Sequence, residues 1–215
     1  IEVNPAGKIY NMYYILGGSH HEVKKVDNSV LYAVETNPNT PNTVEDTAYK
    51  IDYYTGEITN TLDYKNVLMI NRHVDACYSV GSSDWCHMNS LDTYNDIIVM
   101  SSNIQSTVVA TDWGGNIKWM IAEKTGYPEM YWDKILTPVG EDFEHCYNQH
   151  TATVLPDLDN NPDTVDILVF DNGRMRNGHD DIVLQRSSTI YYNELSPLSY
   201  SRIVHYRVNE IEMTG

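Results

Sequence analysis

The feature that most constrains the fold of this chain is a strand pattern that begins three times with a histidine. His21, His87 and His150 each precede a short apolar run, a turn rich in Asp and Asn, and a second apolar run. The three histidines are spaced by 66 and 63 positions. Short β-branched runs separated by turn residues predict strand–turn–strand hairpins.

A second hairpin pattern alternates with the first. It has an Asp or Asn that opens the turn and a Gly that supplies the positive φ. It occurs at residues 4–7, 52–56 and 112–115, and in a looser form from Tyr206 to Gly215. Each histidine-led hairpin is thus followed by a glycine-turn hairpin before the pattern restarts.

Four strands in a unit of roughly 50–65 residues are the signature of a β-propeller. The sequence therefore predicts an all-β fold with almost no helix, at most one short helix near 63–69 or 129–135. The chain holds roughly three such units, and three blades would not close a ring, since known propellers have about four to eight. We expect residues 1–215 to be part of a single β-propeller domain that continues in a longer protein.

Charge and composition restrict the function classes. The formal net charge of −16 argues against non-specific binding of nucleic acid, which needs basic patches. No apolar run approaches the roughly 18 residues that a membrane-spanning helix needs. The chain begins with Ile1 rather than Met, which indicates a processed protein or an excised piece, and we expect a periplasmic or secreted protein.

The cysteines limit the disulfides. There are three, at positions 77, 86 and 146, and an odd count prevents complete pairing within the chain. Cys77 and Cys86 share one loop, where a bridge between them is possible.

The three repeated histidines are the first candidates for a site. In a propeller the innermost strand of each blade lines the central channel, so histidine-led innermost strands would bring His21, His87 and His150 to one channel mouth. The alternative is that each histidine only caps a turn before a strand, but three in register favour a site. Convergent imidazoles can bind a metal, act as acid or base, or attack as nucleophiles.

An arginine pair points toward an anionic ligand. Arg174 and Arg176 follow the apolar run that pairs with the strand after His150, and antiparallel pairing would bring them near that histidine. The guanidinium fork matches the oxygens of a carboxylate, phosphate or sulfate, whereas a nearby metal cation would disfavour a second cation. The alternative is a solvated turn.

Three further residues have chemistry suited to such a ligand. Trp85 could stack on an aromatic ring, Thr151 could donate a hydrogen bond to an oxyanion, and Asn172 lies in the turn before the arginines. Asp84 could orient His87.

Six short strings make a resemblance visible. They occur in the expected order over nearly the whole chain, and they resemble the bacterial arylsulfate sulfotransferase family. The strings are DWCHMNS at 84–90, DIIVMSS at 96–102, IKWMI at 117–121, QHTA at 149–152, FDNG at 170–173 and YSRIV at 200–204.

The resemblance implies a six-bladed propeller that moves a sulfuryl group from a phenolic sulfate ester to a phenol acceptor through a sulfohistidine intermediate. It implies no cofactor and no metal. The implied catalytic residues are His87, His150 and Arg176, and the expected substrate-binding residues are His21, Thr151, Asn172 and Trp85. The nucleophilic histidine of the family is expected in a later blade, beyond Gly215.

The sequence departs from the family pattern in places. An insert from Pro156 to Asp163 lengthens the interval between Gln149 and Arg176, and His145 is an extra histidine near the site.

Two other functions stay open on the sequence alone. One is a non-catalytic propeller that binds anionic aromatic ligands or a protein partner, and the other is a metal-dependent hydrolase built on the three histidines. The expected partners of the enzyme are the sulfate donor and the phenol acceptor, without nucleic acid, and a homo-oligomer is also possible.

Overall fold

Strands and loops make up almost all of the described chain. The structure is a computed structural model, and it describes residues 1–36, 42–68, 83–140, 143–173 and 200–215. Helical structure within these ranges is limited to two 3₁₀ turns, η1 at Tyr64–Asn66 and η2 at Glu129–Tyr131. The sequence predicted at most one short helix, at one of these two places, and each place holds a 3₁₀ turn of three residues. The all-β prediction is confirmed. No helix of the described residues is long and apolar enough to cross a membrane.

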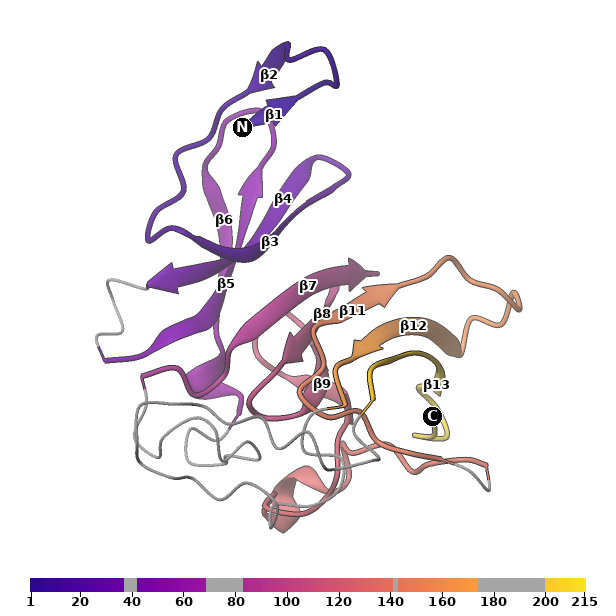
Figure 1. Cartoon of the computed structure of the whole chain (residues 1–215). Helices are drawn as coiled ribbons and strands as arrows, with labels where there is room; N and C mark the ends of the chain where they lie inside the picture. Colours follow the sequence, from indigo (N-terminus) through magenta and orange to yellow (C-terminus); the bar gives the residue numbers. More distant parts are fainter. Residues whose placement is uncertain (37–41, 69–82, 141–142, 174–199) are drawn as a thin grey trace.

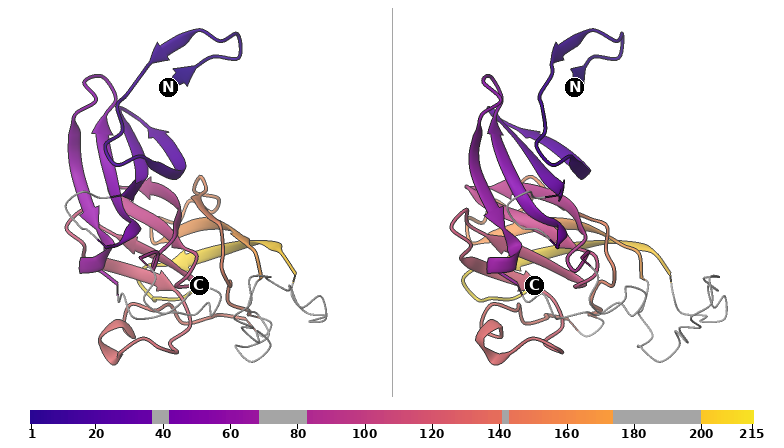
Figure 2. Two further views of the ribbon diagram at one scale, coloured as in Figure 1. Left: turned by 60° about the vertical axis from the view of Figure 1, so that its left-hand side comes forward. Right: turned by 90° about the vertical axis from the view of Figure 1, so that its left-hand side faces the viewer.

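The strands form three larger antiparallel sheets and one small hairpin, and none of these sheets closes on itself. The first sheet has the order β3 (Ser19–Val26), β4 (Ser29–Thr36), β5 (Val44–Asp52) and β6 (Ile58–Asp63). The second has the order β7 (Met88–Tyr94), β8 (Ile97–Ser102), β9 (Thr107–Thr111) and β10 (Ile117–Ile121). The third has the order β11 (Thr151–Val154), β12 (Thr164–Asp171) and β13 (Arg202–Asn209). The hairpin of β1 (Glu2–Val3) and β2 (Ile9–Asn11) projects beyond the end of the first sheet (Figures 1 and 2). The Tyr53 hydroxyl, just after β5, donates to Glu2 Oε2 at 2.6 Å and joins the two.

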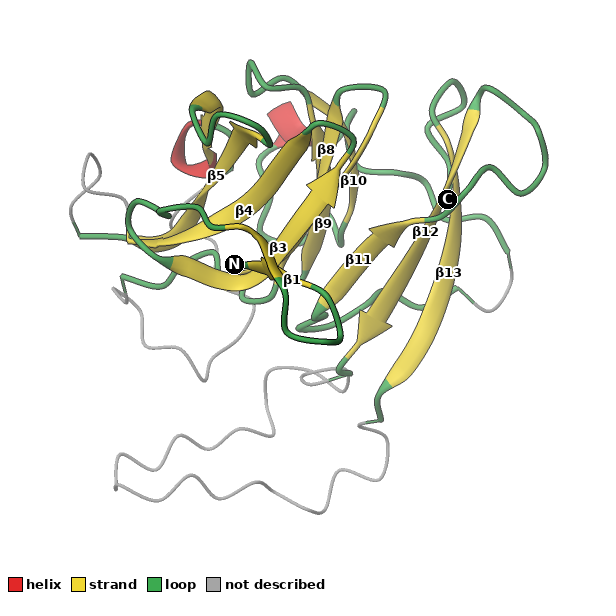
Figure 3. Cartoon of the chain, turned by 90° about the horizontal axis from the view of Figure 1, so that it is seen from above, coloured by secondary structure: helices red, strands yellow, loops and turns green. Residues whose placement is uncertain are grey.

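The three sheets stand side by side, with their first strands at the centre (Figure 3). Strand β7 contacts both β3 and β11. Because each of these is an edge strand, the other strands of every sheet follow outward in sequence order. The arrangement is propeller-like, and it brings the three histidine-led segments to one place.

The glycine-turn hairpins are built by local hydrogen bonds. Asp52 Oδ1 accepts from the backbone N–H groups two and three residues further on, at 2.8 and 2.7 Å. Asp112 Oδ1 accepts in the same way from the N–H groups two and four residues further on, at 2.9 and 3.0 Å. Gly56 and Gly115 complete these turns with φ values of 74° and 82°. An Asp that opens the turn and a Gly at positive φ were predicted, and both are confirmed.

The middle sheet is buried on both faces. Ile98 and Met100 pack toward the first sheet, in one cluster with Ala33 and Ala48. Val99, between them, belongs to a second cluster that includes residues of the third sheet. Alternate residues of a strand point to opposite faces, so β8 packs against both neighbours. This packing holds β3, β7 and β11 against one another.

Cys86 is a buried free thiol in the core. Cys77, with which a bridge is possible on the sequence, lies outside the described residues. Burial raises the pKa of the Cys86 thiol.

Candidate functional site

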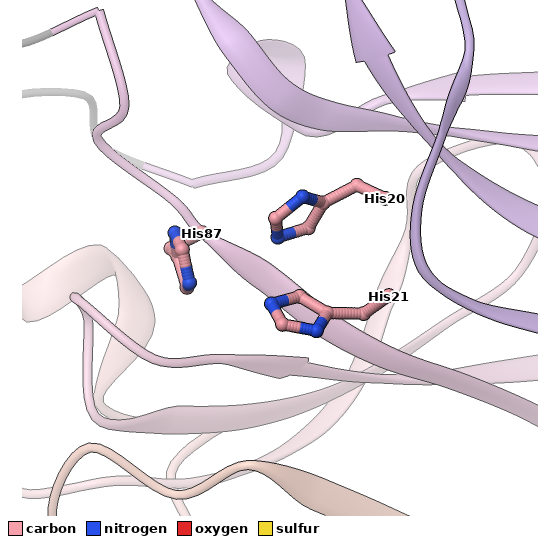
Figure 4. A group of neighbouring side chains, drawn as sticks. All are labelled: His20, His21 and His87. Carbon is pink, nitrogen blue, oxygen red and sulfur yellow. The ribbon is translucent and has the colours of Figure 1, made fainter.

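Four imidazole rings meet where the first strands of the three sheets adjoin. The ring centroid of His21 lies 3.9 Å from that of His20, 5.5 Å from that of His87 and 4.7 Å from that of His150. The centroids of His20 and His87 are 4.9 Å apart. Figure 4 shows His20, His21 and His87 pointing toward one another. The structure thus brings together the three histidines singled out from the sequence and adds His20, whose position directly before His21 was the available signal.

Irregular backbone directs these rings to a common point. The pairing of β3 with β4 shifts register between His20 and Val23, as at a β-bulge, and that of β7 with β8 shifts just after His87. His21 and His87 have φ values of 52° and 49°, a left-handed conformation that is uncommon outside glycine. Bulges re-aim side chains, and strained backbone of this kind clusters at functional sites. The local structure therefore points to a site rather than to simple turn caps.

Two carboxylates contact His87 on the same nitrogen. Its Nδ1 lies 2.7 Å from Asp84 Oδ2 and 2.7 Å from Glu45 Oε2. The same oxygen of Glu45 lies 3.0 Å from His20 Nε2. The contact between Asp84 and His87 follows the expectation from the sequence. Glu45 was missed, because nothing in the Pro- and Asn-rich stretch before it indicates which strand it faces.

Burial and the two carboxylates give the histidines different protonation states. Burial lowers the pKa of His20 to about 4, and neighbouring His21 and His87 add to this effect. Burial is also the main reason that the pKa values of His21 and His150 are lowered. Burial also opposes the charged form of His87, but its hydrogen bonds with Asp84 and Glu45 prevail and raise its pKa to about 9. Near pH 7 the cluster therefore holds one imidazolium among neutral imidazoles.

The nitrogen and oxygen atoms of these histidines and carboxylates are also of the kinds that bind metal cations. Ligand atoms of His20, His21 and His87 lie within 4.8 Å of one another, and so do those of Glu45, Asp84 and His87. Ligand atoms on a tetrahedral zinc are about 3.3 Å apart, given bonds of about 2.0–2.1 Å. The contacts of 2.7 Å at His87 are shorter and have the length of charge-assisted hydrogen bonds. At Nδ1 of His87 the geometry is therefore that of an ion pair, with a hydrogen bond to Asp84.

Two of the expected substrate-binding residues lie beside His150. Thr151 is the first residue of β11, and its hydroxyl is 3.4 Å from His150 Nδ1. The side-chain amide of Asn172 donates to the carbonyl of Asn148 at 2.6 Å, which ties the turn after β12 to the segment before His150. The two arginines, Arg174 and Arg176, lie outside the described residues.

Trp85 has a different position from the one expected of a stacking residue. Its side chain is fully buried in the core between the first two sheets, and its indole N–H donates to Asp46 Oδ2 at 2.7 Å. No face of the ring is open to a ligand in this structure. The placement corrects the expectation of substrate stacking, because the irregular segment just before β7 turns this ring inward.

A substitution at Trp85 should therefore affect stability. We expect Trp85→Phe to lower the free energy of unfolding by about 2–3 kcal/mol, because buried Asp46 loses a hydrogen-bond donor. Trp132→Phe is the control, since Trp132 is 43% exposed, and a loss below about 1 kcal/mol is expected there. Urea denaturation of both variants measures the difference. A Trp85→Phe protein with unchanged stability and a raised KM for an aryl substrate would restore the stacking role.

The fold and the cluster define an all-β protein with a histidine site at the meeting of its sheets. The sequence matches the family described as "Arylsulfotransferase (ASST)" over residues 1–215, its whole length. The chain therefore belongs to the arylsulfotransferase family, and the resemblance read from the six short strings is confirmed. A comparison with curated proteins finds no match. Membership indicates aryl sulfotransferase activity, with aryl sulfates and phenols as the substrate classes.

Proposed function

We propose that this chain carries part of the active site of an aryl sulfotransferase that moves a sulfuryl group from a phenolic sulfate ester to a phenol. The observation that carries the proposal is the convergence of His21, His87 and His150 from three sheets in a member of this family. The propeller-like arrangement of the sheets supports a six-bladed propeller of which residues 1–215 form a part. A periplasmic or secreted location is proposed on the same family resemblance.

The proposed reaction passes through a sulfohistidine. A histidine nitrogen attacks the sulfur while the S–O bond to the donor phenol breaks, and that phenolate leaves with a proton. The acceptor phenol then attacks the sulfur, the S–N bond breaks, and the phenol proton passes to a base. The nucleophilic histidine is expected beyond Gly215.

The described histidines suit the supporting roles. An imidazolium at His87 can donate a hydrogen bond to a sulfate oxygen, where negative charge is stabilised in the transition state. A neutral imidazole at His150 can accept the proton of the acceptor phenol. His21, Thr151 and Asn172 are proposed to bind substrate, since His21 contacts the His150 ring and the other two lie beside it. Arg176 stays a proposed catalytic residue on the resemblance alone.

Initial-rate kinetics test this function. With 4-nitrophenyl sulfate as donor and phenol as acceptor, we expect nitrophenol release that depends on phenol, and parallel lines in double-reciprocal plots. Parallel lines are expected because the donor product leaves before the acceptor binds, as in other covalent mechanisms. Release at the same rate without phenol would contradict transfer and indicate a hydrolase, and intersecting lines would contradict the covalent intermediate.

A further inference from the structure

We propose that Glu45 is a positioning residue that places a second carboxylate against Nδ1 of His87, whose hydrogen bond is with Asp84, and so keeps His87 cationic among neutral imidazoles. The inference rests on the proposed function, because the anion that this cation would serve is the sulfate group of the donor. Glu45 lies in none of the six family strings, so the proposal adds a new residue to the site. It also assigns a protonation state to His87.

Nδ1 of His87 has two carboxylate oxygens beside it but only one hydrogen to donate. An imidazole nitrogen carries one hydrogen at most, yet Nδ1 of His87 has carboxylate oxygens of both Glu45 and Asp84 at 2.7 Å. Two carboxylates held against one nitrogen repel each other, and either a positive charge between them or a proton on one of them relieves the repulsion. An imidazolium at His87 supplies positive charge next to both carboxylates.

The backbone around Glu45 and Asp84 holds their two carboxylates together. Residues 44–46 lie along residues 83–85, and a hydrogen bond joins the segments on each side of the Glu45–Asp84 pair. The Val44 N–H donates to the Ser83 carbonyl at 3.0 Å, and the Trp85 indole donates to Asp46 at 2.7 Å. Glu45 itself has a φ of 58°, an unfavourable conformation that persists only where its surroundings enforce it. The site thus maintains the close approach of like charges at the expense of stability.

Imidazole rings and carboxylates face His87 from several elements. His20 and His21 face it from β3, His150 from the segment before β11, Glu45 from β5, and Asp84 from the segment before β7. The three imidazoles have lowered pKa values and carry no charge near pH 7. Burial raises the pKa of Glu45, against the effect of its hydrogen bond with His87. Glu45 and Asp84 are therefore the groups that favour the charged form of His87 within the described residues.

Histidine titration by NMR tests the proposal directly. In protein labelled with ¹⁵N at histidine, we expect His87 to titrate near pH 9. In Glu45→Gln its pKa should fall by about 1–3 units, the effect of removing one opposite charge at this distance. Glu57→Gln is the matched control, because it removes the same charge from an exposed residue in the β5–β6 turn, and the pKa of His87 should not change.

The pH dependence of the reaction gives a second readout. Because an imidazole is charged below its pKa and neutral above it, the alkaline limb of kcat/KM for 4-nitrophenyl sulfate should follow the titration of His87. The limb should move to lower pH in Glu45→Gln by the same amount as the NMR titration, and should not move in Glu57→Gln. A purely structural role for Glu45 would lower the rate equally at all pH values.

Several results would overturn the proposal. A His87 pKa that is the same in Glu45→Gln and wild type removes the positioning role, whatever the activity. One equivalent of bound zinc in the purified wild-type protein also removes it, because the metal would neutralise the two carboxylates in place of the proton. A lowered pKa in Glu45→Gln, in a wild-type protein that transfers no sulfuryl group, leaves the role of Glu45 supported and removes the proposed function instead. If Glu45→Gln does not fold, Glu45→Ala replaces it, and a folded Ala variant with an unchanged His87 pKa overturns the proposal.

Discussion

His150→Ala is expected to lower kcat for transfer from 4-nitrophenyl sulfate to phenol by about 10²–10³-fold or more, the usual loss when a preorganised catalytic group is removed. The His150 ring lies 4.7 Å from that of His21, at the point where β11 adjoins β7. Its pKa is lowered mainly by burial, so the ring is neutral and able to accept a proton at neutral pH. Removing it deletes the proposed base, and steady-state kinetics at pH 7 to 8 measures the loss.

The matched control for this prediction is His205→Ala. His205 is on β13, outside the cluster, with its Nε2 2.6 Å from Asp166 Oδ1. We expect that variant to keep kcat within a few-fold of wild type. Equal losses in the two variants would mean that the effect at His150 comes from folding, and no loss at His150 would place the catalytic base elsewhere.

Gln149→Leu is expected to lower the free energy of unfolding by about 2–4 kcal/mol and to reduce kcat as well. The Gln149 side chain is fully buried, and its Nε2 donates to the carbonyls of Ser102 and Thr107 at 2.9 and 2.8 Å. These bonds fasten the segment before His150 to the end of the β8–β9 hairpin. Leucine has nearly the same size but no donor, so two buried carbonyls lose a partner and His150 loses its support.

Chemical denaturation and kinetics on the same preparations test this second prediction. Thr59→Val is the control, since its exposed hydroxyl also donates to a backbone carbonyl, that of Lys50 at 3.1 Å, and we expect a loss below about 1 kcal/mol. If Gln149→Leu matches the stability of wild type, the two buried bonds do not hold the sheets together. If it is destabilised with full kcat, the position of His150 does not depend on them.

The features of the fold that could be predicted are those formed by interactions between residues close together in the sequence. The turns at Asp52 and Asp112 follow from hydrogen bonds that span two to four residues, so the Asp and Gly types predict them directly. The all-β character follows in the same way from short alternating runs. His87 and His150 could be singled out because their strands repeat, and repetition is visible in a sequence.

The directions of the side chains at the site could not be predicted from local sequence patterns. Trp85 is two positions from His87, and the sequence does not indicate that one side chain enters the core while the other joins the cluster. Backbone geometry decides this, because His87 has a left-handed φ of 49° and the register of β7 against β8 shifts beside it. A bulge of this kind has no reliable sequence signal when the residue at positive φ is not glycine.

By itself, the sequence determined the all-β class, the local turns, the family and the histidines that open two of the central strands. Only the tertiary structure decided that Glu45, 42 positions before His87, shares a nitrogen of that histidine with Asp84. That contact depends on the pairing of β4 with β5, on the hydrogen bonds between residues 44–46 and 83–85, and on the packing of two sheets. A slip of one residue in the register of β5 would turn Glu45 to the opposite face of its sheet. The physical reason is that turn chemistry is complete within a few residues, whereas a contact between sheets exists only after register and packing have been established.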